Sequence, residues 1–141
     1  MNFKLFQQIQ CNTVDDLINF GKSFVKYINP GDLCELDGNL GAGKTTFVKG
    51  IAQGYNILEE VTSPTFNLMT MYYGDINLIH IDAYRMEYGE RLDVLDFAPE
   101  PYVIFVEWAK NLQEISDIIS WKIKFTIDSN GFRNLFIYTR I

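Results

Sequence analysis

The sequence predicts an α/β fold of the P-loop NTPase type, with a central, mostly parallel sheet flanked by helices and a C-terminal antiparallel hairpin. Two observations carry this prediction. Residues 38–45 read GNLGAGKT and match the G-x-x-x-x-G-K-[ST] phosphate-binding (Walker A) loop, which follows a strand pattern at 33–37. Residues 102–106 are almost continuously apolar, as expected of a central strand buried on both faces. We expect residues 1–141 to form one domain.

The first half of the chain is expected to form a strand and a helix, then a turn that ends before residue 33, and then a second strand and a second helix. Residues 3–9 are predicted to form a short strand. Thr13 fits a helix N-cap, with Asp16 in a weak capping box, and apolar residues then recur at helical spacing to Ile28. A second helix is predicted directly after the phosphate loop, and Gly54 ends it.

The second half is expected to contain an extended segment at 63–73, a strand at 76–82, a short polar helix at 87–97, the central strand, and strands at 121–127 and 135–138. In the strand at 76–82, Leu78, His80 and Asp82 fall on one face. Apolar and polar residues alternate along 121–127, and Asn130-Gly131 follows as a hairpin signal. This last part of the sheet is therefore predicted to be antiparallel.

Each residue type of the phosphate loop suits phosphate binding. Gly38, Gly41 and Gly43 let the backbone reach positive φ and approach the phosphates closely. Lys44 brings a positive charge to the β/γ-phosphates, and the Thr45 hydroxyl is a Mg²⁺ ligand in such loops. The N-terminus of the following helix adds its free N–H groups and its dipole. The sequence therefore predicts a nucleoside triphosphate site.

Composition and charge limit the classes of partner and location. The 141 residues are 48% hydrophobic, which is typical of a globular protein, and no apolar run approaches a membrane span of about 20 residues. Cys11 and Cys34 are isolated, so we expect a reduced, cytoplasmic location. The net charge of −6 disfavours direct binding to nucleic acid and favours a protein partner. We expect a monomer when the protein is free, with no contact to a membrane.

Two carboxylates fall at the ends of predicted strands. Asp82 ends LIHID and Glu107 ends YVIFVE. Because ligands of open α/β sheets lie beyond the carboxyl ends of the strands, these acids are candidates to hold Mg²⁺ or to orient water. The alternative for each is a solvated charge at the end of a strand. The sequence leaves open which of them contacts the metal.

Four motifs in order, GNLGAGKTTF, SPTF, HIDAYR and VEW, resemble the TsaE family, also called YjeE. The resemblance extends from Thr13 through the C-terminal hairpin. It implies the small ATPase of the bacterial pathway that makes threonylcarbamoyladenosine at position 37 of tRNAs. The implied partner is the TsaD–TsaB pair, with ATP hydrolysis resetting that complex between rounds of modification and tRNA involved only indirectly. The implied cofactors are ATP and Mg²⁺.

The sequence departs from the family pattern at three places. Asn39 stands where the family usually has Asp, which argues against a catalytic role for it. Glu35 is an unusual charge for a strand that the fold would bury. Arg133 resembles the first of a frequently doubled arginine, but Asn134 replaces the second.

By this resemblance, the candidate nucleotide-binding residues are Thr13, Leu40, Gly41, Ala42, Gly43, Lys44, Thr45, Thr46, Asp82 and Arg133. The candidate catalytic residues are Lys44, Thr65 and Asp82, and the candidate Mg²⁺ ligands are Thr45 and Glu107. Thr13 is interpreted first as a helix cap, with a nucleotide contact as the alternative. Thr65 resembles a switch residue that senses the γ-phosphate, with a plain strand start as the alternative. His80 is interpreted as a packed, hydrogen-bonded strand histidine, and Trp108 as core or partner surface.

Two other functions are weighed against an ATPase. A small-molecule kinase usually carries an arginine-rich lid, whereas this chain has only four scattered arginines, Arg85, Arg91, Arg133 and Arg140. A nucleotide-gated binding module would need ATP to dock and would hydrolyse it negligibly. A GTPase is disfavoured because the chain has no N-K-x-D tetrapeptide. Phosphate release with and without partners and small acceptors separates these functions.

Overall fold

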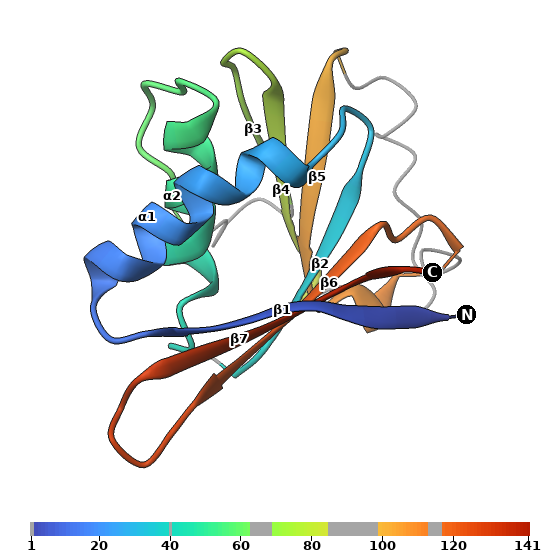
Figure 1. The fold of residues 1–141 in the computed structure, drawn as a ribbon. Helices are drawn as coiled ribbons and strands as arrows, with labels where there is room; N and C mark the ends of the chain where they lie inside the picture. The colour runs from blue at the N-terminus through green and yellow to red at the C-terminus, as the bar shows by residue number, and fades with distance from the viewer. Residues whose placement is uncertain (1, 40, 63–68, 85–98, 113–116) are drawn as a thin grey trace.

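The computed structural model describes residues 2–39, 41–62, 69–84, 99–112 and 117–141 of the chain. Its elements are β1 (Phe3–Cys11), α1 (Val14–Phe24), the 3₁₀ helix η1 (Val25–Tyr27), β2 (Leu33–Asp37), α2 (Lys44–Gly54), β3 (Met69–Tyr72), β4 (Asn77–Asp82), β5 (Tyr102–Glu107), the 3₁₀ helix η3 (Ala109–Asn111), β6 (Trp121–Ile127) and β7 (Arg133–Arg140). Figure 1 shows α1 and α2 packed together on one face of a twisted sheet.

The seven strands form one sheet in the order β1-β7-β6-β2-β5-β4-β3. Its central strands β6, β2, β5 and β4 run parallel to one another. The C-terminal hairpin of β6 and β7 is antiparallel, as the sequence predicts. The edge strands β1 and β3 also pair antiparallel, with β7 and β4 respectively, so the sheet is more mixed at its edges than predicted. The parallel core places the carboxyl ends of β2, β4 and β5 at one edge of the sheet, beside the phosphate loop.

The two faces of the parallel strands are buried in separate apolar clusters. Along β4, Leu78 packs with the helices, while Ile79 and Ile81 join the cluster on the other face. Within β5, the side chains of residues 103–107 are all buried. Parallel strands covered on both faces read as continuous apolar runs, which explains why the sequence located β5. Glu35 on β2 is half-buried beside Lys122, and burial raises the pKa of its carboxyl, partly offset by that lysine.

The helix α1 begins as predicted and ends earlier. The Thr13 hydroxyl accepts a hydrogen bond of 3.0 Å from the Asp16 N–H, so Thr13 is the N-cap. The α-helix ends at Phe24, where the chain tightens into η1 instead of continuing as α-helix to residue 28. Its buried face includes Phe20, while Val14 in the first turn is 65% exposed.

The helices α1 and α2 cross in close contact through two glycines. A Cβ on Gly21 would lie 2.5 Å from the Phe47 carbonyl oxygen, and a Cβ on Gly50 would lie directly against the Ile18 carbonyl oxygen. Only glycine leaves room for the two backbones to approach this closely. Because α2 follows the phosphate loop, this crossing also fixes α1 and its N-cap beside the loop.

The hairpin turn between β6 and β7 places Arg133 at the start of β7. Gly131 has a φ of 81°, and its N–H donates to the Asp128 carbonyl at 3.0 Å. The Asp128 carboxylate accepts from the N–H groups of Asn130 and Phe132. A type I turn followed by a left-handed glycine is a common hairpin connection, and the Asn-Gly pair signals it.

Three predicted features fall on residues that the structure does not describe. They are the helix at 87–97, the SPTF motif with Thr65, and Leu40 of the loop. None of the described helices has the length and apolar character needed to cross a membrane.

Candidate functional site

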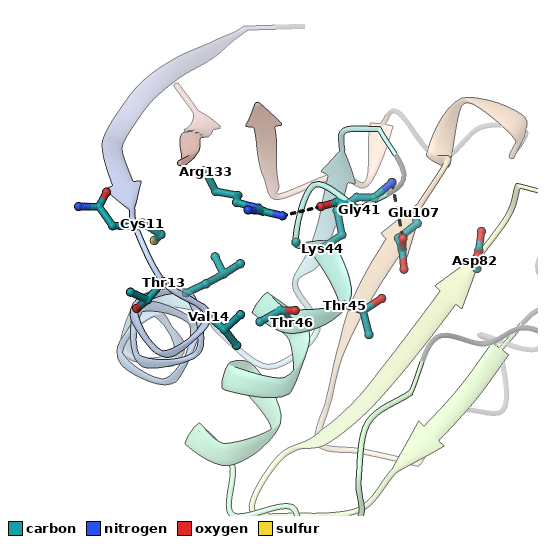
Figure 2. Close-up of a pocket in the computed structure, with 13 residues that line it drawn as sticks. Cys11, Thr13, Val14, Gly41, Lys44, Thr45, Thr46, Asp82, Glu107 and Arg133 are labelled. Carbon is teal, nitrogen blue, oxygen red and sulfur yellow. Dashed lines mark hydrogen bonds and ion pairs between the residues drawn. The ribbon is translucent and has the colours of Figure 1, made fainter. Parts of the chain in front are cut away.

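The phosphate loop opens onto a cavity of about 440 Å³. Four parts of the fold form its walls: the turn from β1 into α1, the loop with the start of α2, the ends of β4 and β5, and the start of β7 (Figure 2). Its lining comprises Cys11, Asn12, Thr13, Val14, Leu17, Gly41, Gly43, Lys44, Thr45, Thr46, Asp82, Glu107 and Arg133. A cavity of this size accommodates a small-molecule ligand.

The loop backbone has the conformation that its glycines predict. Gly41 has a φ of 81°, and Gly43, the N-cap of α2, has a φ of 103°. A Cβ on Gly43 would lie 2.5 Å from the Leu17 Cδ2, so the loop fits closely against α1. No side chain caps the start of α2 in the described structure. Its first N–H groups and the positive end of its dipole are therefore available to an anion in the cavity.

Lys44, the first residue of α2, is only 5% exposed and lines the cavity. Its Nζ donates to the Gly38 carbonyl oxygen at 2.6 Å and lies 3.6 Å from Glu107 Oε1. The same ammonium lies 5.3 Å from the centre of the Trp108 ring. These contacts hold the ammonium beside the loop, where it suits a phosphate oxygen.

Glu107 ends β5 and has a partner at each carboxylate oxygen. Its Oε2 lies 2.8 Å from His80 Nε2 on the neighbouring β4, and its Oε1 faces Lys44. Burial by itself raises the pKa of Glu107. The hydrogen bond from His80 and the positive charge of Lys44 outweigh burial and hold this pKa below its usual value. Glu107 is therefore a buried carboxylate that is held in its anionic form.

Asp82 stands opposite Glu107 in the register of β4 and β5, and Figure 2 shows it at one side of the cavity. Its Oδ1 accepts from the Tyr84 N–H at 3.0 Å, which ties it to the turn after β4. The neighbouring Trp108 takes a left-handed backbone conformation with a φ of 60° and packs its ring against Tyr84, 4.9 Å between centroids. Trp108 is half-buried beside the cavity, so its ring is neither fully in the core nor fully at the surface.

Arg133 and Thr13 lie on the opposite wall, away from Asp82 (Figure 2). The Arg133 guanidinium donates to the Gly41 carbonyl at 3.1 Å and to the Gly131 carbonyl at 3.0 Å. The C-terminal hairpin is therefore bonded to the phosphate loop through one side chain. Thr13 lines the cavity while its hydroxyl caps α1, so the cap and a nucleotide contact are compatible uses of one residue.

The structure brings most of the predicted site residues into one cavity, namely Thr13, Gly41, Gly43, Lys44, Thr45, Thr46, Asp82, Glu107 and Arg133. Ala42 is buried instead, and its N–H donates to the Asn39 carbonyl at 3.0 Å. Leu40 and Thr65 lie outside the described residues. The roles assigned to all these residues stay predictions.

Sequence reasoning missed part of the lining, the four residues Cys11, Asn12, Val14 and Leu17. They lie on either side of Thr13, and the helix cap at Thr13 was the only local feature of the sequence that pointed to this part of the cavity. Cys11 reaches the loop through the pairing of β1 with β7 and Leu17 through the crossing of α1 with α2, and no local pattern reports either. The interaction between His80 and Glu107 also depends on strand register and was not predicted.

The oxygen donors at the cavity fit a hard divalent cation. The Thr45 hydroxyl and the carboxylates of Glu107 and Asp82 all line it. Mg²⁺ prefers oxygen ligands and commonly takes only one or two from the protein, with water and phosphate oxygens completing its shell. The residues present therefore suit a Mg²⁺ that arrives with a nucleotide.

Comparison with known proteins gives a consistent set of similarities. Residues 11–135 match a family model described as "Threonylcarbamoyl adenosine biosynthesis protein TsaE". The chain is 39% identical over 112 residues to the tRNA threonylcarbamoyladenosine biosynthesis protein TsaE of Bacillus subtilis (strain 168), covering 77% of this chain and 71% of that protein. It is 36% identical over 120 residues to the TsaE of Treponema pallidum (strain Nichols), covering 79% and 87%. The crystal structure of Bacillus subtilis YdiB superposes with a TM-score of 0.77 at 26% identity, covering 100% of this chain and 89% of that one.

Proposed function

The chain belongs to the TsaE family of threonylcarbamoyl adenosine biosynthesis proteins, and from this membership we propose that it is a cytoplasmic, Mg²⁺-dependent ATPase supporting threonylcarbamoyladenosine modification of tRNA. One observation carries the proposal. A buried lysine, two strand-end carboxylates and an uncapped helix start converge on one cavity at the phosphate loop. We propose that residues 1–141 act as a single domain, which the continuous seven-stranded sheet supports.

In this function the loop and Lys44 bind the nucleotide phosphates. The free N–H groups at the start of α2 would bind phosphate oxygens, and the Lys44 ammonium would neutralise charge on the β/γ-phosphates. Thr13, Thr46 and Arg133 line the same cavity and are proposed nucleotide contacts. Since the Arg133 guanidinium already contacts the Gly41 carbonyl, it would hold the loop in shape as well.

Thr45 and Glu107 are the proposed Mg²⁺ ligands. When bound, Mg²⁺ neutralises charge that develops on the β- and γ-phosphate oxygens during hydrolysis. Glu107 suits the ligand role because its carboxylate is anionic and lies beside the Lys44 ammonium. Asp82, beside Glu107 at the end of β4, is proposed to orient the attacking water. Thr65 is proposed as the switch residue that senses the γ-phosphate.

Asp82→Asn is expected to lower turnover by about 10²-fold, the lower range for a positioned acid–base group, with little change in ATP affinity. An amide keeps the size of the side chain but loses the charge that orients water. Steady-state phosphate release and calorimetric ATP binding check the two effects separately. Asp117→Asn, the same change at an exposed position outside the cavity, is the matched control and should behave as wild type. A loss of binding equal to the loss of turnover would contradict the water-orienting role.

We propose that the TsaD–TsaB pair is the partner on which ATP hydrolysis acts. The net charge of −6 supports a protein partner over direct tRNA binding. Arg133 is already bonded to the Gly41 carbonyl, which leaves it poorly placed to act as an arginine finger. Hydrolysis by the chain alone is therefore expected to be slow, since a missing finger lowers the rate by about 10³–10⁵-fold in related enzymes.

Phosphate release by the chain alone, with the TsaD–TsaB pair, with free tRNA and with a panel of small hydroxyl acceptors tests this function. We expect at least about tenfold stimulation by the protein pair and none by tRNA or the acceptors. ADP appearing together with a phosphorylated acceptor would establish a small-molecule kinase instead. Nucleotide-dependent docking to the pair without phosphate release would establish a binding module.

A further inference from the structure

His80 is a buried residue of β4 that contacts Glu107 of the candidate metal site. It is fully buried on β4, with 0% exposure, on the strand face that also carries Asp82. Its Nε2 lies 2.8 Å from Glu107 Oε2. Through this contact it reaches the carboxylate on the side away from Lys44, which lies nearer Oε1.

The surroundings of the other ring nitrogen of His80, Nδ1, differ from those of Nε2. Among the described residues, Nδ1 is buried and has no hydrogen-bond partner. A proton on Nδ1 would leave a buried donor unsatisfied, whereas a lone pair there costs less. Because an ionised carboxylate can only accept, the 2.8 Å contact requires a proton on Nε2, and Nε2–H donates to Glu107 Oε2. An apolar side chain would fill the same space without leaving an unpartnered nitrogen, so packing alone does not account for a histidine here.

We propose that His80 is a positioning residue that fixes the Glu107 carboxylate through the Nε2–H···Oε2 bond and so keeps it oriented to ligate Mg²⁺. The proposal rests on the proposed function, in which Glu107 is a Mg²⁺ ligand. Ligating carboxylates are commonly held by a second hydrogen bond, and loss of such a partner costs about 10–100-fold in metal affinity. Without His80, the carboxylate would be free to close the 3.6 Å gap to the Lys44 ammonium and to form a full hydrogen bond with it in place of binding the cation.

The test compares three variants by calorimetric titration of Mg²⁺ into the protein with ADP. His80→Leu removes the donor and keeps the bulk, while His80→Gln places an amide N–H at about the reach of Nε2. His80→Asn carries its amide at the shorter reach of Nδ1. We expect the half-saturating Mg²⁺ concentration to rise about 10–100-fold in the Leu and Asn variants and to stay near wild type in the Gln variant. ADP affinity without Mg²⁺ should be unchanged in all three.

Glu107→Gln separates this inference from the proposed function. If Glu107→Gln leaves the Mg²⁺ requirement unchanged, the assignment of Glu107 as a ligand is wrong, and the inference about His80 is wrong with it. If Glu107→Gln raises the requirement and His80→Leu does not, only the positioning role is overturned. If the Leu variant fails to fold, the contrast between Gln and Asn decides, since equal Mg²⁺ requirements in those two would also overturn the role.

Discussion

Lys44→Ala is expected to lower ATP hydrolysis by about 10²–10³-fold, the usual loss when one preorganised donor to a developing negative charge is removed. ATP affinity should fall as well, because the ammonium binds the phosphates in the ground state. The loop should persist, since its conformation comes from Gly41 and Gly43 and from the Arg133 bond to Gly41. The fold loses the hydrogen bond to the Gly38 carbonyl and the ion pair with Glu107, neither of which sets the backbone conformation of the loop.

Calorimetric ATP binding, phosphate release and thermal unfolding check this result together. Lys110→Ala is the matched control, because the Lys110 ammonium also lies over the Trp108 ring, at 5.1 Å, but does not line the cavity at the loop. We expect Lys110→Ala to bind ATP as wild type does. Equal ATP affinity in Lys44→Ala and wild type would remove the phosphate-loop assignment.

Gly50→Ala is expected to destabilise the fold by about 1–3 kcal/mol, the cost of overpacking a close contact. In an ordinary helix interior the same change stabilises by about 0.8–1 kcal/mol, so the crossing with α1 reverses the sign. The new Cβ would press on the Ile18 carbonyl oxygen and lie 3.1 Å from Gly21 Cα, both backbone atoms that have no rotamer to change. Relief requires α1 to move away from α2.

Chemical denaturation of both variants measures the effect, with Gln53→Ala, an exposed position on the same helix, as the control. Gln53→Ala should leave the free energy of unfolding nearly unchanged. Because α1 carries Thr13 beside the phosphate loop, Gly50→Ala should also weaken ATP binding at temperatures where the fold persists. A stability gain in Gly50→Ala would show that the helices do not cross as described.

The features that the sequence predicted have local causes. The loop, both helix starts, the alternation in β6 and the turn at Gly131 each depend on neighbours within a few residues. The central β5 was found because burial on both faces leaves an unbroken apolar run. Asp82 and Glu107 were predicted to lie together because the carboxyl ends of parallel strands lie at the same end of a sheet. In the structure, β4 pairs with β5 so that Asp82 is directly opposite Glu107.

The features that it did not predict depend on pairing between distant segments. The apolar run at helical spacing begins with Val14, but spacing does not report which part of the run is covered, and Val14 lines the cavity and is 65% exposed. The antiparallel pairing of β1 with β7 has no local signal in the sequence, and this pairing brings Cys11 to the loop. The bond between His80 and Glu107 required the register of β4 and β5, since an alternating strand pattern gives the face of a side chain and not its partner.

The strand order has a consequence for how the protein is made. The phosphate loop follows β2, yet β2 is flanked by β5 and β6, and the edge strand β1 pairs only with β7 in the described sheet. A nascent chain that has just completed the loop therefore lacks both strands that pair with β2, so neither hydrogen-bonding edge of β2 is paired at that stage. Sheets built from such distant pairings close slowly, on the scale of milliseconds to seconds. The nucleotide site consequently forms late, after β7 has been synthesised, and the unfinished chain exposes unpaired strand edges until then.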